Sequence, residues 1–255
     1  MTANDHARAY WQYEYDVAGR SMIPLLEGWG IQLRGAAVLD VGCGEGGGVC
    51  AMQDRGALCR GMDIDTGRIA AAERLRGERQ IPFAVGNLYE EAVPFMDRSY
   101  DLLVLHDVFE HLDRKEEMLR KLGGCLSPGA GLMITFPPYY SAYGAHQQHL
   151  RAGFAKLPFI HLVPFMLSRI VPRLRGEHPH VVEEVSKLGR LKMGMRKFER
   201  LASGAGFAIA GKQAYLISPN HIRFGLTPLP AGPLASVPLL DELLCTGVVY
   251  LLRRS

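Results

Sequence analysis

The sequence has few cysteines and no pairing pattern among them. Its 255 residues include five cysteines, at positions 43, 50, 59, 125 and 245, and none forms a Cys-x-x-Cys pair. An odd number of scattered thiols argues against a disulfide framework and against a zinc site built from thiolates.

Long apolar runs are also lacking. The most apolar stretch, Phe154 to Val171, is interrupted by Lys156, His161, Arg169 and prolines, whereas a membrane-spanning helix needs about 18 apolar residues in a row. The first 15 residues hold no apolar segment like that of a signal peptide. We therefore expect a cytoplasmic protein without a transmembrane segment. Residues 154–175 are apolar with a cationic end, which suits a lid, a dimer contact or peripheral contact with a membrane surface.

The chain carries little net charge. Twenty-nine Lys and Arg residues against 26 Asp and Glu residues leave a formal charge of +3, with no basic cluster. A nucleic-acid-binding protein usually shows a clustered basic surface, so we expect no nucleic-acid partner. The apolar fraction of 48% is that of a globular protein with a sizeable core.

Glycine and proline are abundant, with 29 and 15 residues, and they punctuate an alternation of short apolar runs and helix-like segments. This alternation predicts an α/β fold of the doubly wound type, with a mostly parallel seven-stranded sheet and an antiparallel last strand. The strands are expected at 37–41, 58–62, 83–85, 100–105, 131–136, 206–216 and 245–252, and helices near 47–55, 66–76, 114–122 and 195–204. Thr66 is the expected N-cap of the second of these helices.

The alternation fails between residues 137 and 192, where six prolines and several aromatic clusters occur. We interpret residues 137–194 as a helical lid insertion that covers a substrate. Residues 1–36 then form an N-terminal cap helix, and residues 37–136 and 195–255 form the core. A monomer and a homodimer are both compatible with this division.

The densest glycine cluster, Gly42 to Gly48, lies where the first predicted strand ends and a helix begins. Glycines allow the backbone to turn sharply and to approach a ligand, and a helix N-terminus offers free N–H groups. Gly42-x-Gly44-x-x-Gly47 also fits the dinucleotide fingerprint of nicotinamide and flavin enzymes, so the glycines alone do not identify the ligand.

Asp63 follows Gly42 by 21 residues, at the end of the second predicted strand. An acidic side chain at this place can accept hydrogen bonds from both hydroxyls of an adenosine ribose, and Asp65 competes for that position. The three segments Asp40-Val41-Gly42-Cys43-Gly44-Glu45-Gly46, Gly61-Met62-Asp63-Ile64-Asp65 and Tyr100 to Leu112 together resemble the class I S-adenosylmethionine-dependent methyltransferases. The resemblance covers residues 37–136 and, more loosely, 195–252.

The resemblance implies S-adenosylmethionine as the cofactor and a set of residues that hold it. Asp40 would position the methionine ammonium, and Gly42, Gly44 and Gly46 would let the backbone pass beneath the methionine and ribose. Asp63 would bind the ribose hydroxyls.

The adenine and the sulfonium have their own expected neighbours. Ile64 would lie against the adenine, and Asn87 and Leu88 would reach its amino group, although the family more often has Asp where Asn87 stands. His106 and Asp107 would border the sulfonium at the exit of the fourth strand.

An aromatic segment, Tyr10 to Tyr15, precedes the first strand and is followed by Arg20. In enzymes of this kind an N-terminal helix closes over the cofactor, so Tyr13 and Arg20 are candidates to reach the methionine carboxylate. Ordinary packing of an amphipathic helix explains the same pattern.

Histidines are the candidate catalytic bases, because a neutral imidazole can take a proton from a hydroxyl near pH 7. We consider His146 first, then His149 and His106. His146 and His149 are three residues apart and would suit a metal ion on one helical face, but no carboxylate is evident beside them, so we expect no metal site.

The function expected from these features is methyl transfer from S-adenosylmethionine to an oxygen of a small molecule or sugar, in natural-product or surface-glycan biosynthesis. Carbon and nitrogen acceptors remain open. Two other classes compete: an NAD-dependent oxidoreductase, favoured by the glycine spacing alone, and a non-catalytic protein that binds S-adenosylmethionine.

Overall fold

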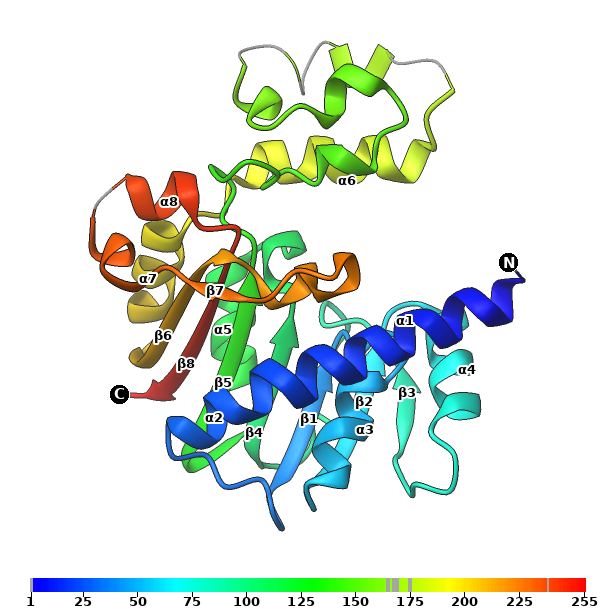
Figure 1. Cartoon of the computed structure of the whole chain (residues 1–255). Helices are drawn as coiled ribbons and strands as arrows, with labels where there is room; N and C mark the ends of the chain where they lie inside the picture. Colours follow the sequence, from blue (N-terminus) through cyan, green and yellow to red (C-terminus); the bar gives the residue numbers. More distant parts are fainter. Residues whose placement is uncertain (1, 164–165, 167–169, 174–175, 238) are drawn as a thin grey trace.

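The computed structural model describes residues 2–163, 166, 170–173, 176–237 and 239–255, and these build one sheet with helices on both faces (Figure 1). The sheet has eight strands in the order β3-β2-β1-β4-β5-β8-β6-β7. The strands are β1 (Ala37–Val41), β2 (Leu58–Asp63), β3 (Phe83–Val85), β4 (Tyr100–His106), β5 (Leu126–Phe136), β6 (Phe207–Ile217), β7 (Leu229–Pro230) and β8 (Gly247–Arg254).

Strands β1 to β5 pair in parallel, and β8 runs antiparallel to both β5 and β6. The predicted fold class is confirmed, including the antiparallel last strand. The structure adds one strand to the seven expected, the two-residue β7, which pairs with the outer edge of β6. A pair this short, containing Pro230, is compatible only with an edge.

The helices are α1 (Ala3–Val17), α2 (Ile23–Gly28), α3 (Gly47–Asp54), α4 (Thr66–Leu75), α5 (Lys115–Gly123), α6 (Pro179–Leu191), α7 (Met195–Gly204) and α8 (Leu240–Leu244). Alternate residues of each central strand serve opposite faces of the sheet. Val38 and Val104 pack in the cluster that contains Val17 and Val49, whereas Leu39 and Leu103 pack in the cluster with α5 and α7.

Capping residues set where two of these helices begin. Thr2 and Asp5 form a capping box at the start of α1. The N-cap of α4 is Asp65 rather than Thr66, because its Oδ1 accepts from the backbone N–H groups of Gly67 (2.7 Å) and Arg68 (3.0 Å). The competitor for the ribose position is therefore engaged in holding a helix end.

The described residues of the segment 137–194 lie beyond the edge where the parallel strands end (Figure 1). The described part of this segment contains short 3-10 turns and α6, which begins at Pro179. Arg169 and Arg175, part of the cationic end noted above, lie outside the described residues. Among the described residues, no helix combines the length and apolarity needed to cross a membrane.

Helix α1 lies directly on the start of α3, and two adjacent glycines test this contact. A Cβ atom at Gly47 would overlap the carbonyl oxygen of Trp11, whereas one at Gly48 would have no neighbour closer than 3.6 Å. We expect Gly47→Ala to lower the free energy of unfolding by about 1–3 kcal/mol through overpacking. Gly48→Ala should be neutral or stabilising by about 0.5–1 kcal/mol, because alanine favours helices. Thermal unfolding measures both, and equal melting temperatures would contradict the contact.

Candidate active site

The site lies where β1, β2 and β4 end, the edge at which open α/β sheets bind ligands. Three cavities adjoin there. Their volumes are about 150, 310 and 680 Å³, and Asp63 and Asp107 line all three.

The smallest cavity is bounded by the glycine turn. Gly42 has a φ of +81°, a conformation that favours glycine, and a Cβ atom there would overlap Val108. The backbone N–H of Gly44 donates to Asp63 Oδ2 at 2.9 Å. The turn is thereby held against the end of β2, with its backbone exposed to a ligand.

Glu14 of α1 reaches the start of α3. Its two carboxylate oxygens accept hydrogen bonds from the backbone N–H groups of Glu45 (3.2 Å) and Gly47 (2.9 Å). The helix N-terminus, which often binds an anion, is therefore occupied by a side chain of the same protein. Burial raises the pKa of Glu14 well above its ordinary value, and the nearby Glu45 and Asp40 add to the shift.

Asp40, the fourth residue of β1, is buried and lines the smallest cavity. Its Oδ1 has no hydrogen-bond partner. Burial, together with the charge of Asp63, raises its pKa to about 7. A buried carboxylate oxygen without a partner suits a cationic ligand group, since burying an unpaired charge is costly.

Asp63, unlike Asp40, accepts a hydrogen bond on each of its carboxylate oxygens. Its Oδ2 accepts from Gly44 and its Oδ1 from the backbone N–H of Asp65 at 2.9 Å. These two bonds fix the orientation of the carboxylate while leaving further lone pairs on each oxygen.

The 310 Å³ cavity continues from Asp63 along the ends of β2 and β3. Ile64 is 66% exposed beside it. Asn87 lines it too, with its Oδ1 accepting from the backbone N–H of Tyr89 at 3.0 Å. Leu88 borders the cavity, but its side chain belongs to the hydrophobic core. The cavity thus offers one exposed apolar side chain and an amide to a flat ring.

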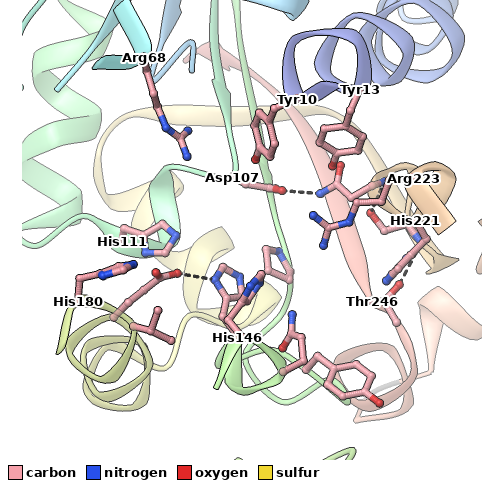
Figure 2. A pocket seen from close by; sticks show the side chains of 18 of the residues that line it. Tyr10, Tyr13, Arg68, Asp107, His111, His146, His180, His221, Arg223 and Thr246 are labelled. Carbon is pink, nitrogen blue, oxygen red and sulfur yellow. Dashed lines mark hydrogen bonds and ion pairs between the residues drawn. The ribbon is translucent and has the colours of Figure 1, made fainter. Parts of the chain in front are cut away.

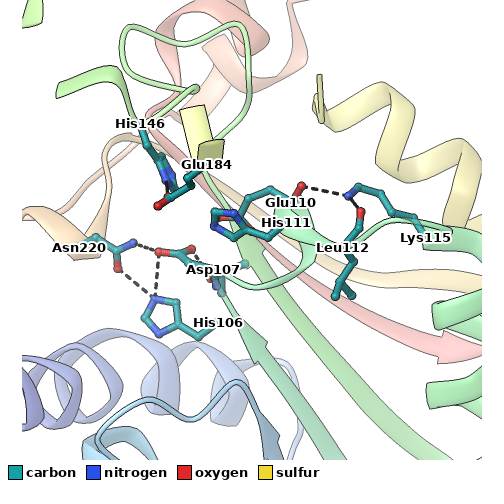
Figure 3. A network of polar contacts seen from close by, with 10 residues as sticks. His106, Asp107, Glu110, His111, Leu112, Lys115, His146, Glu184 and Asn220 are labelled. Carbon is teal, nitrogen blue, oxygen red and sulfur yellow. Dashed lines mark hydrogen bonds and ion pairs between the residues drawn. The ribbon is translucent and has the colours of Figure 1, made fainter. Parts of the chain in front are cut away.

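A polar network fixes the end of β4 (Figure 3). The Asp107 backbone has a φ of +53°, and its carboxylate accepts from Thr135 Oγ1 at 2.8 Å and from the Asn220 amide. His106 Nε2 donates to Asn220 Oδ1 at 3.0 Å. Because that nitrogen carries a hydrogen, His106 cannot accept a proton there.

The 680 Å³ cavity lies between the sheet edge, α1, α6 and the segment after β6 (Figure 2). Five imidazoles line it, those of His111, His146, His149, His180 and His221. His146 Nδ1 hydrogen-bonds Glu184 Oε1 at 2.9 Å. That bond lowers the pKa of Glu184 to about 2, and burial lowers the pKa of His149.

Known methyltransferases resemble this chain in sequence. Residues 39–134 match a family model described as a methyltransferase domain. Over 251 residues the chain is 24% identical to an uncharacterized methyltransferase of Mycolicibacterium paratuberculosis. The aligned region spans 98% of this chain and 89% of that protein. By the match to the family model, residues 39–134 form a methyltransferase domain.

Solved structures share the fold of this methyltransferase. The magnesium protoporphyrin IX methyltransferase of Synechocystis, with S-adenosylhomocysteine bound, aligns with a TM-score of 0.55 at 17% identity, over 95% of this chain and 84% of that chain. A mitomycin 7-O-methyltransferase aligns with a TM-score of 0.55 at 14% identity, over 97% of this chain and 54% of the other. Structures of this fold have been solved with S-adenosylmethionine and with S-adenosylhomocysteine bound.

The two N-terminal candidates, Tyr13 and Arg20, line different cavities. Tyr13 lines both the 150 and the 680 Å³ cavities, and burial raises its pKa. Arg20 lies outside all three cavities; it forms an ion pair with Asp16 at 3.6 Å and lines a different hollow. The reason is the π-helical turn Ala18–Met22, which shifts the helical register between the two residues.

Sequence reasoning missed several residues that line these cavities, and Arg68, Glu14 and Asn220 are among them. Arg68, in the first turn of α4, borders both the 150 and the 680 Å³ cavities and lies over the Tyr10 ring. The segment Asp63-Ile64-Asp65 gives a signal for Arg68, because Arg68 lies in the first turn of the helix that follows this segment at the same sheet edge. No sequence pattern indicated Glu14 or Asn220.

Asp40 provides a test on the ligand-free enzyme. Its pKa is about 7 when folded against an ordinary 3.8, so ionisation destabilises the fold progressively from about pH 4 to pH 7. We expect Asp40→Asn to raise the free energy of unfolding at pH 8 by up to about 4 kcal/mol, at about 1.4 kcal/mol per pKa unit, and by clearly less at pH 5. Thermal unfolding at both pH values measures this, with exposed Asp97→Asn as the control. An equal effect at pH 5 and pH 8 would contradict the assignment.

Proposed function

We propose that this methyltransferase transfers the methyl group of its cofactor, S-adenosylmethionine, to an oxygen atom of a small molecule or sugar, in natural-product or surface-glycan biosynthesis. The observation that carries the proposal is the large imidazole-lined cavity. It shares four lining residues with the 150 Å³ cavity beside it: Tyr13, Asp63, Arg68 and Asp107. An acceptor in the larger cavity would therefore lie against a cofactor in the smaller ones.

The charges around the 150 Å³ cavity match the methionine part of the cofactor. Glu14, Asp40 and Asp63 supply carboxylates next to one cation, Arg68. In the proposal, the unpartnered Oδ1 of Asp40 takes the methionine ammonium, and Arg68 pairs with the methionine carboxylate in place of Arg20.

The remaining cofactor contacts follow the other cavity. Asp63 would accept from the ribose hydroxyls, with Ile64, Asn87 and Leu88 around the adenine. His106 and Asp107 would border the sulfonium, and Tyr13 would close the cavity from α1.

Transfer is an in-line displacement at the methyl carbon. The acceptor oxygen forms a bond to that carbon as the carbon–sulfur bond breaks, its electrons remain on sulfur, and S-adenosylhomocysteine leaves. Correct alignment alone is worth about 7–11 kcal/mol. The acceptor's proton passes to an imidazole in the cavity wall, that of His149 or His146, and Glu184 orients His146.

The division of the chain follows from this use of the cavities. We propose that residues 1–36 cap the cofactor, that 37–136 and 195–255 form its binding core, and that 137–194 cover the acceptor. Phe154, Leu157 and Phe159 are exposed on that cover, which supports peripheral membrane contact of 154–175 by a cytoplasmic enzyme.

Asp63 is the test of the cofactor site. We expect Asp63→Ala to weaken binding of S-adenosylhomocysteine at least tenfold, about 1.4 kcal/mol, through loss of charged hydrogen bonds. Calorimetric titration measures the affinity, and the exposed Asp97→Ala provides a control of the same type. Unchanged affinity in a folded Asp63→Ala protein would remove Asp63 from the site.

His146 is the test of the acceptor site. Incubation of cell extracts with the enzyme and methyl-labelled S-adenosylmethionine should yield a product heavier by one labelled methyl group, identified by mass spectrometry. With that acceptor, His146→Ala should lower turnover about 100-fold or more while leaving S-adenosylhomocysteine affinity unchanged. A methyl group found on carbon or nitrogen would refute the proposed acceptor atom, and full turnover would refute the role of His146.

A further inference from the structure

Two histidines and a buried carboxylate converge at one side of the acceptor cavity (Figure 3). Glu110, His111 and His146 each offer a ligand atom, and these atoms all lie within 4.8 Å of one another. Glu110 and His111 belong to the 3-10 turn η2 (Phe109–His111) after β4, and His146 precedes the turn η3 (Gln147–His149). We propose that this cluster binds a divalent transition-metal cation.

Glu110 is the strongest reason. Its side chain is 2% exposed, and neither carboxylate oxygen has a hydrogen-bond partner. The nearby ammonium of Lys115 donates instead to the main-chain oxygens of Glu110 and Leu112. Buried charges in proteins are paired or coordinate metals, and the fold supplies this carboxylate with no hydrogen-bonded partner of its own.

The two imidazoles are arranged to share an ion with that carboxylate. Their ring centroids are 5.4 Å apart, and His111 Nε2 lies 3.6 Å from Glu110 Oε1. His146 adopts the left-handed backbone conformation, with a φ of +56°, which costs free energy and is concentrated at functional sites in non-glycine residues.

Glu184 completes the arrangement from α6. Its bond to His146 Nδ1 leaves Nε2 as the ring nitrogen available to an ion. Metal-binding histidines commonly donate their other N–H to a carboxylate, which fixes the ring and raises its basicity. Glu184 is therefore a positioning residue rather than a ligand.

The donor set favours one class of ion. Imidazole nitrogen suits Zn²⁺ and similar transition metals, and carboxylate oxygen suits these and Mn²⁺. This site was not expected from the sequence, which paired His146 with His149 and showed no carboxylate. The structure brings the carboxylate and the second imidazole from a distant segment, while His149 lies outside the cluster.

The ion would have a task in methyl transfer, and this step rests on the proposed function. His111 and His146 line the acceptor cavity, so a coordination position left open by the protein faces the acceptor. A hydroxyl bound there has a lowered pKa; its proton passes to the free imidazole of His149, and its oxygen attacks the methyl carbon as the carbon–sulfur electrons remain on sulfur.

Metal binding is tested without any acceptor. We expect protein freed of metal with a chelator to bind one Zn²⁺ or Mn²⁺ ion per chain in calorimetric titrations. Glu110→Gln, His111→Ala and His146→Ala should each weaken binding at least 100-fold, whereas the exposed His6→Ala should not. Glu184→Ala should weaken it about 10-fold to 100-fold, and Glu184→Gln, which keeps an acceptor for Nδ1–H, should weaken it less.

The same variants are titrated with S-adenosylhomocysteine. An intact affinity shows that the fold and cofactor site persist, and Glu110→Gln, which preserves shape, replaces any histidine variant that unfolds. The proposal is overturned if neither ion binds the parent protein, or if binding persists in folded Glu110→Gln and His111→Ala. Ion binding without methyl transfer to oxygen would leave the site standing and refute the proposed function alone.

Discussion

Buried negative charge is the constraint around which this structure is organised. Glu14, Asp40, Asp63 and Asp107 line one cavity of about 150 Å³, and among the described residues that line it Arg68 is the one Lys or Arg side chain. Burial raises the pKa of both Glu14 and Asp40, so the ligand-free protein bears an electrostatic cost there. A positively charged ligand group bound there would relieve that cost, so its binding would also stabilise the fold.

The sheet makes this concentration of charge unavoidable. Parallel strands end at the same edge, and the register of β1 with β2 places Asp40 opposite Gly61, two residues before Asp63. The backbone N–H groups of the glycine turn then compensate part of the charge, since Gly44 donates to Asp63 and Gly47 to Glu14. The glycines serve the carboxylates of the protein as well as a ligand.

What the sequence predicted well was local or periodic. β1, β3 and α7 begin and end where expected. Their boundaries depend on apolar runs and on glycines within a few residues of each end, and a local sequence pattern shows both. Asp63, which was singled out by its spacing from the glycine turn, lies at the end of β2 and lines all three cavities. Arg20 was placed wrongly because Tyr13 and Arg20, seven residues apart, share one face of an uninterrupted α-helix, and nothing in the sequence indicated the π-helical turn Ala18–Met22 that separates them.

The acceptor side shows why the remainder needed the structure. His146 and Glu184 are 38 residues apart and joined by a 2.9 Å hydrogen bond, and the ring centroid of His111 lies 5.4 Å from that of His146. No periodic pattern relates these positions, because η2, η3 and α6 meet only through the packing of the 137–194 segment onto the strand ends. Substitutions in that segment can therefore change the chemistry of the 680 Å³ cavity, while the edge around Asp63, built from backbone turns and strand register, stays the same.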